Sequence, residues 1–153
     1  MKLLTGVMFL ACVPLAIAKG HEDYPKEKIP EYVVEKVNVK VLPSALRPKL
    51  EKGKQTFADY GYVTSKIDDK EAIVEAPNGG PRISISILQE DKTGIYVCLN
   101  GNAQNQNAGR IQRVLLLKSK NPDSLLMGTE SSKAFSGCPA IGGADPGAGS
   151  SGY

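Results

Sequence analysis

Hydrophobic and polar residues alternate along several stretches of this chain of 153 residues. Between Tyr32 and Leu42, valine occupies positions 33, 37, 39 and 41, whereas Lys36, Asn38 and Lys40 are polar. A period of two is typical of a strand that buries one face. The pattern therefore predicts a strand over residues 32–42.

A second stretch has apolar residues at helical spacing. Its stripe steps by four, three, four and three residues through Leu46, Leu50, Gly53, Phe57 and Tyr60. Such spacing places the side chains on one face of a helix, and Pro48 suits a first helical turn. The spacing predicts a helix over residues 47–59, ended by Gly61.

The remaining patterns predict strands joined by short turns. Isoleucines at 83, 85 and 87 alternate with serines at 84 and 86, which indicates a half-buried strand. Further strands are expected at 72–74, at 95–99 and at 111–118, where the apolar run 114–117 suggests burial on both faces. Turns are expected at 77–81 (Pro-Asn-Gly-Gly-Pro) and at 91–94.

These elements predict an α+β fold in which one helix packs on a four- to five-stranded, mainly antiparallel sheet. The length allows a single domain, which we assign to residues 32–138. The expected order of elements is similar to that of cystatin-like domains. The Gln-x-Val-x-Gly hairpin of cystatins is absent, so this resemblance concerns architecture alone.

The N-terminal residues have the composition of an export signal. Lys2 precedes an uncharged apolar run over residues 3–18 that ends in Ala16-Ile17-Ala18, a pattern typical of a signal peptidase site. We predict a signal peptide over 1–18, a mobile charged arm over 19–31 and a flexible Gly/Ser-rich tail over 139–153. A retained anchor and a lipobox at residues 9–12 are the alternatives. The prediction is a secreted or periplasmic protein with no stable membrane insertion after cleavage.

Cleavage after residue 18 would remove Cys12 and leave two cysteines, Cys98 and Cys138. Exported proteins favour paired cysteines, so these two are expected to form a disulfide. In the expected strand over 95–99, Cys98 lies opposite in parity to Ile95, Val97 and Leu99. The disulfide should therefore hold the C-terminal segment across the sheet face that points away from the core.

Charge and composition exclude several function classes. The formal net charge of +3 is too small to argue for nucleic-acid binding, and a single histidine excludes sites that need two. That histidine belongs to the expected arm, so a hydrolytic triad is not expected. These observations favour a non-catalytic binding or accessory domain.

Two segments carry candidate binding chemistry. Cleavage after residue 18 would expose Lys19-Gly20-His21, whose amine, backbone amides and imidazole can hold Cu(II) or Ni(II) in a square plane of nitrogens. This metal site is the alternative to the binding-domain hypothesis.

The second segment is an amide-rich loop over residues 100–109. Amide side chains both donate and accept hydrogen bonds, so such a loop suits a polar ligand or a protein partner. Its candidate binding residues are Asn100, Asn102, Gln104, Asn105, Gln106 and Asn107. An exposed sheet edge, which can accept an added strand, is the other expected contact surface.

Overall fold

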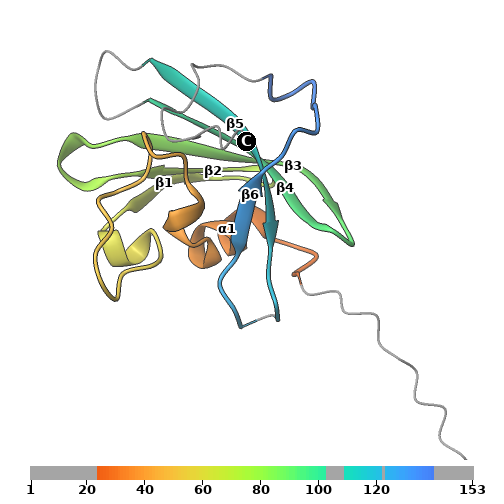
Figure 1. The fold of residues 1–153 in the computed structure, drawn as a ribbon, viewed down its shortest axis with the longest axis horizontal. Helices are drawn as coiled ribbons and strands as arrows, with labels where there is room; N and C mark the ends of the chain where they lie inside the picture. The colour runs from red at the N-terminus through yellow and green to blue at the C-terminus, as the bar shows by residue number, and fades with distance from the viewer. Residues whose placement is uncertain (1–23, 103–108, 122, 140–153) are drawn as a thin grey trace, which may run out of the picture.

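The computed structural model describes residues 24–102, 109–121 and 123–139, and within them six strands form an antiparallel sheet that follows the chain order (Figure 1). The strands are β1 (Val63–Ile67), β2 (Glu71–Glu75), β3 (Arg82–Asp91), β4 (Gly94–Asn102), β5 (Arg110–Lys118) and β6 (Met127–Glu130). The α-helix α1 (Ile29–Lys36) precedes them, with short 3-10 turns η1 (Val39–Val41), η2 (Ala58–Tyr60) and η3 (Pro77–Gly79). The α+β class is confirmed, and the sheet has six strands instead of the expected four or five.

The expected strand over 32–42 is wrong, because this segment contains the helix and η1. Pro30 and Glu31 occupy the first turn of α1, and Lys36 lies in its last turn. Both charges interact favourably with the helix dipole. The valines at 33 and 37 are both buried. Their spacing of four residues fits a helix as well as a strand, which is why the alternation predicted the wrong element. Asn38 then accepts a hydrogen bond from the Lys40 backbone N–H at 3.0 Å and caps η1.

The expected helix over 47–59 is also wrong, and only η2 is helical there. Gly53 has a φ of +86°, a left-handed conformation that interrupts a helix. Asp59 accepts hydrogen bonds from the backbone N–H groups of Gln55 and Thr56, both at 2.8 Å, and so stabilises a turn in place of helical bonds. Phe57 is buried, yet Leu50 of the same expected stripe is 45% exposed.

The main core lies between α1 and the inner face of the sheet, chiefly under β2 and β3 (Figure 1). Ile83 and Ile85 point into it while the intervening serines face outward, as the alternation predicts. The apolar run of β5 is covered on both faces, which confirms that expectation. The fully buried side chains include Val33, Leu46, Phe57, Val74, Ile95, Leu99, Leu117 and Leu126.

The folded part of the chain begins before residue 32. Of the expected arm over 19–31, residues 24–31 are described, and Ile29 and Pro30 are buried. The hydroxyl oxygen of Tyr24 accepts a hydrogen bond from the Ser119 backbone N–H at 3.3 Å. The expected signal peptide lies outside the described residues, as does the tail beyond residue 139.

Candidate functional site

The outer face of the sheet, which points away from α1, divides into a covered half and an open half. On the covered half, Cys98 and Cys138 are joined as a disulfide with Cα atoms 5.7 Å apart. They form a second, smaller apolar cluster with Val114, against which Leu88, Tyr96 and Phe135 pack. Cys98 therefore faces away from the main core, as its parity predicts.

The segment over 131–138 lies across this covered half. The Ser131 backbone N–H donates to the Val114 carbonyl at 2.8 Å, and the rings of Tyr96 and Phe135 lie 5.4 Å apart. Lys133 places its ammonium 4.5 Å from the centre of the Tyr96 ring and donates to Gln89 at 2.8 Å. Among the described residues, the segment over 131–138 therefore covers this half of the outer face.

Six polar side chains from three adjacent strands belong to the open half, five of them exposed or half-buried and Gln112 buried, and we name this surface the polar face. One cross-strand row, the arginine row, consists of Arg82, Asn102 and Arg110: Asn102 pairs with Arg110, and the pairing of Ile83 with Gly101 places Arg82 across from Asn102. The next row consists of Ser84, Asn100 and Gln112. On each strand, the residue of one row and the residue of the other are two positions apart. Side chains two positions apart on a strand point to the same side, so both rows project from one face of the sheet.

Contacts within the polar face hold part of it in place and leave a hollow. Arg110 Nε donates to Asn100 Oδ1 at 2.7 Å, and Arg82 Nε lies 3.4 Å from Glu75 Oε1. The hollow has a volume of about 310 Å³ and is lined by Arg82, Ser84, Asn100, Gly101, Asn102 and Arg110. Adjacent strands are about 4.8 Å apart, so the two arginines flank it from backbones about 10 Å apart.

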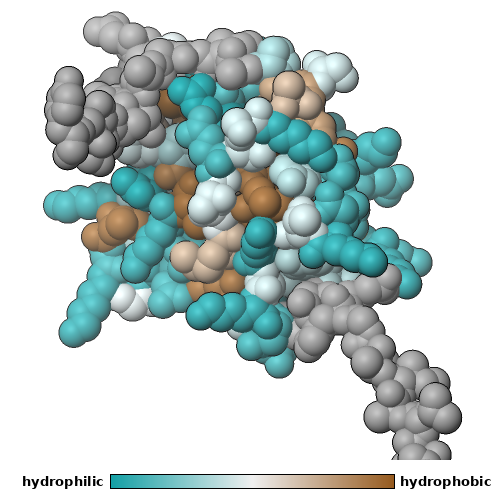
Figure 2. Space-filling model, turned by 45° about the vertical axis from the view of Figure 1, so that its right-hand side comes forward, coloured by the Kyte–Doolittle hydropathy of each residue, from teal (hydrophilic) through white to brown (hydrophobic). Residues whose placement is uncertain are grey.

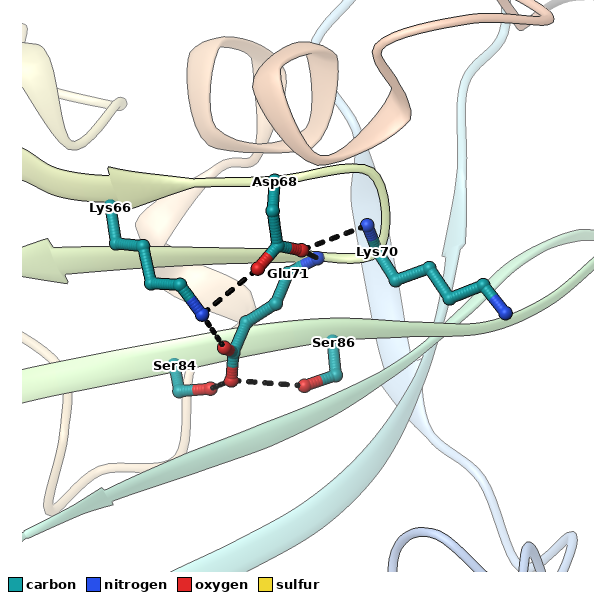
Figure 3. Close-up of polar contacts among 6 residues, drawn as sticks. All are labelled: Lys66, Asp68, Lys70, Glu71, Ser84 and Ser86. Carbon is teal, nitrogen blue, oxygen red and sulfur yellow. Dashed lines mark hydrogen bonds and ion pairs between the residues drawn. The ribbon is translucent and has the colours of Figure 1, made fainter.

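A charged network adjoins the polar face at the β1–β2 turn (Figure 3). Lys66 Nζ lies 2.9 Å from Asp68 Oδ2 and 3.0 Å from Glu71 Oε2. The Ser84 hydroxyl donates to Glu71 Oε1 at 2.5 Å, and the Ser86 hydroxyl donates to the same oxygen at 3.5 Å. Because its hydrogen is used by Glu71, Ser84 presents an acceptor oxygen to the polar face.

This network lowers the pKa of Glu71, first through the hydrogen bond from Ser84 and then through the one from Lys66. A carboxyl whose pKa is lower in the folded state stabilises the fold above the pKa of the unfolded chain. That stabilisation is lost as the pH falls through the folded-state value.

We therefore predict that Glu71→Gln reduces the acid dependence of stability below about pH 4.5, the ordinary range of a glutamate. Above that range, the variant should be less stable than the wild type by about 1 kcal/mol or less, because the network is partly exposed. Urea unfolding at pH 3, 4, 5 and 7 measures both effects. Glu35→Gln, on the opposite layer of the molecule, serves as the control. An unchanged acid dependence in Glu71→Gln would contradict the prediction.

The structure places only part of the expected binding residues. Asn100 and Asn102 lie at the end of β4 and belong to the polar face. Gln104, Asn105, Gln106 and Asn107 lie outside the described residues.

The expected metal site stays a prediction, since Lys19, Gly20 and His21 also lie outside the described residues. Within the part of the chain that the structure describes, no group of three or more His, Cys, Asp or Glu side chains is placed to hold a metal ion.

Sequence reasoning missed Arg82, Ser84, Arg110 and Gln112 as site residues. A signal for them exists in the alternation itself, because every residue opposite in parity to the buried isoleucines must face outward. The alternation assigns Ser84 to that face, but it does not distinguish a site residue from any other outward residue. Which outward residues become neighbours depends on the register between strands, which local patterns do not define.

A larger hollow of about 720 Å³ lies near the β1–β2 turn, lined by residues from 26–31, 67–70 and 87–90. Its lining carries both signs of charge, and Lys28 and Glu31 lie within 4.0 Å of each other there. Burial raises the pKa of Glu90 in this lining. The mixture of charges gives the hollow less preference for one class of ligand than the polar face has.

The sheet edges offer less than the sequence suggested. All five residues of the edge strand β1 are exposed, but a bulge between Thr64 and Lys66 interrupts its register. Bulges and lysines on edge strands hinder the addition of another strand. At the other edge, Leu126 forms a parallel bridge with Val37 just before β6. We therefore base the functional argument on the polar face.

No family model, curated protein or solved structure matches this chain. None of the helices among the described residues is long and apolar enough to cross a membrane.

Proposed function

We propose that this protein is an exported, non-catalytic binding or accessory module whose polar face binds a ligand that carries carboxylates. The observation that supports this most is the arginine row, in which two guanidinium groups flank one amide on neighbouring strands. Guanidinium groups bind carboxylates in bidentate geometry, and amides supply further donors and acceptors. The predicted export signal and the disulfide support the location outside the cytoplasm.

The face of the molecule seen in Figure 2 also favours a polar recognition mode. On the face shown in Figure 2, polar and charged side chains predominate, and apolar residues reach the surface only in limited areas between them. Large exposed apolar patches usually mark hydrophobic interfaces. Charge and hydrogen bonding at the polar face are therefore the stronger source of specificity.

A charge-removal experiment tests this function. We expect the double variant Arg82→Gln/Arg110→Gln to bind hexaglutamate at least about tenfold more weakly than the wild type, since hydrogen bonds to charged groups contribute about 1.5–3 kcal/mol each. Glu75→Gln should bind the same peptide more tightly, because Glu75 is the ion-pair partner that competes for Arg82. Isothermal titration calorimetry at low salt measures all three proteins.

Lys118→Gln/Lys120→Gln is the matched control. It removes the same charge at and beyond the opposite end of β5, and it should retain wild-type affinity. An equal loss in both double variants would show a general charge effect and contradict the proposal. A second probe is an oligogalacturonate, a sugar chain that carries carboxylates. A wild type that binds neither hexaglutamate nor the oligogalacturonate would contradict the proposal as well.

A further inference from the structure

A second groove adjoins the polar face and shares two residues with it. It has a volume of about 710 Å³, and its lining includes Arg82 and Asn102 of the arginine row. The rest of its wall carries Pro48, Tyr60, Tyr62, Pro77 and Pro81. We name it the tyrosine groove. A ligand that binds the arginine row at Arg82 therefore lies at the mouth of this groove.

The turn between β2 and β3 forms one rigid wall of the tyrosine groove. Pro77 begins η3, Asn78 adopts a left-handed conformation with a φ of 59°, and the Ala76 N–H donates to the Pro81 carbonyl at 3.0 Å. A Cβ atom on Gly80 would lie 2.8 Å from the Cβ of Ala76, so this position accepts only glycine without rearrangement. A wall fixed in this way is formed before a ligand arrives, which lowers the entropic cost of binding.

The opposite wall presents two tyrosines. The Tyr60 hydroxyl accepts from the Glu51 backbone N–H at 2.8 Å, which fixes its ring. The ring of Tyr62 packs on Phe57 at 5.0 Å, and its buried hydroxyl has no hydrogen-bond partner among the described residues. Because this hydroxyl is closed off from solvent, Tyr62 contributes its ring to the wall of the groove.

We propose that the ligand of the polar face is an extended peptide segment in which acidic residues are followed by prolines. This inference rests on the proposed function and specifies the class of ligand. Polyproline II segments, whose backbone is already extended and exposes its carbonyls, dock in grooves lined by aromatic side chains. The acidic residues contact the arginine row, and the prolines lie in the tyrosine groove.

Charge is consistent with this arrangement. Three basic side chains, Lys49, Arg82 and Arg110, line the groove and the adjoining hollow, against one acidic side chain, Glu51. Glu51 is already paired with Lys54 at 2.9 Å, and Arg82 is paired with Glu75 at 3.4 Å. The region therefore has an excess of positive charge that complements an acidic segment.

Two peptides that differ only in their second half test the inference. Acetyl-Glu-Glu-Pro-Pro-Pro-Pro-amide is expected to bind the wild type at least about fivefold more tightly than acetyl-Glu-Glu-Gly-Ser-Gly-Ser-amide, because the preformed segment loses less entropy. Tyr60→Ala and Pro48→Ser should each remove this preference while the Gly/Ser peptide binds as before. Chemical-shift mapping of the wild type should show the backbone amides of residues 78–80 responding to the proline peptide alone.

The outcomes separate the two proposals. Equal binding of both peptides, with shifts confined to the arginine row, would overturn the inference and leave the proposed function in place. An oligogalacturonate that binds more tightly than either peptide would also overturn it and assign the site to an acidic sugar. If no probe binds, both proposals fail. Because Tyr60→Ala changes a half-buried residue, the melting temperature of each variant is compared, and Pro48→Ser supplies the result if Tyr60→Ala does not fold.

Discussion

Replacing Cys98 and Cys138 together with alanine is expected to lower the free energy of unfolding by about 4 kcal/mol. The disulfide joins positions separated by 40 residues, and cross-linking a loop of that length removes conformational entropy from the unfolded chain. The loss is a large share of the net stability of an ordinary domain. Urea denaturation of wild type and variant in oxidising buffer measures the difference.

Two comparisons check the origin of this effect. Treatment of the wild type with dithiothreitol should give the stability of the double variant, and the double variant itself should not respond to the reductant. A wild type that unfolds at the same urea concentration with and without dithiothreitol would contradict the prediction. Since the covered half of the outer face excludes the arginine row, the folded double variant should retain affinity for hexaglutamate.

The face of each central strand could be predicted from local pattern. Ile83 and Ser84 point to opposite sides because side chains alternate along any strand, whatever its neighbours are. The same argument placed Cys98 away from the core, and with it the disulfide. These predictions needed only the identity of a strand and the parity of its residues.

The elements before β1 could not be predicted in the same way. Val33 and Val37 satisfy a helical spacing and a strand alternation at once, so periodicity alone does not choose between them. Pro30 and Lys36 are local evidence for a helix, since they lie in its first and last turns. In the segment after residue 46, the left-handed Gly53 and the turn around Asp59 outweigh an apolar stripe that is helical in sequence.

The polar face depends on register, which is a property of pairs of strands. A bulge between Ile87 and Gln89 shifts the pairing of β3 with β4 by one residue. The bulge lies between the turn at 91–94 and the arginine row. Extending the pairing from that turn without the bulge would therefore place a different residue opposite Arg82. Arg82 and Arg110 are 28 positions apart in the printed sequence, and only two successive pairings bring them together.

The substitution Phe57→Ala is expected to lower the free energy of unfolding by about 3–5 kcal/mol, the usual cost of removing a buried aromatic ring. Phe57 is 1% exposed, and its ring packs on Tyr62, which lines the tyrosine groove. Truncation of Phe57 leaves a cavity behind Tyr62 in the groove wall and not behind the arginine row. The variant should therefore lose its preference for the proline peptide and retain affinity for hexaglutamate. Urea denaturation and calorimetry measure the two effects.

Leu50→Ala is the decisive companion to this variant. Both residues belong to the apolar stripe that predicted a helix over 47–59, and in such a helix they would be buried on one face and cost similar amounts. In the observed turn-rich segment Leu50 is 45% exposed, so its truncation should cost about 1 kcal/mol or less. A loss for Leu50→Ala as large as that for Phe57→Ala would favour the helix and contradict the observed course of the chain. A large difference between the losses for Phe57→Ala and Leu50→Ala would show that the buried ring of Phe57 anchors this segment. The shape of the tyrosine groove then depends on that ring, because Tyr62 packs on it.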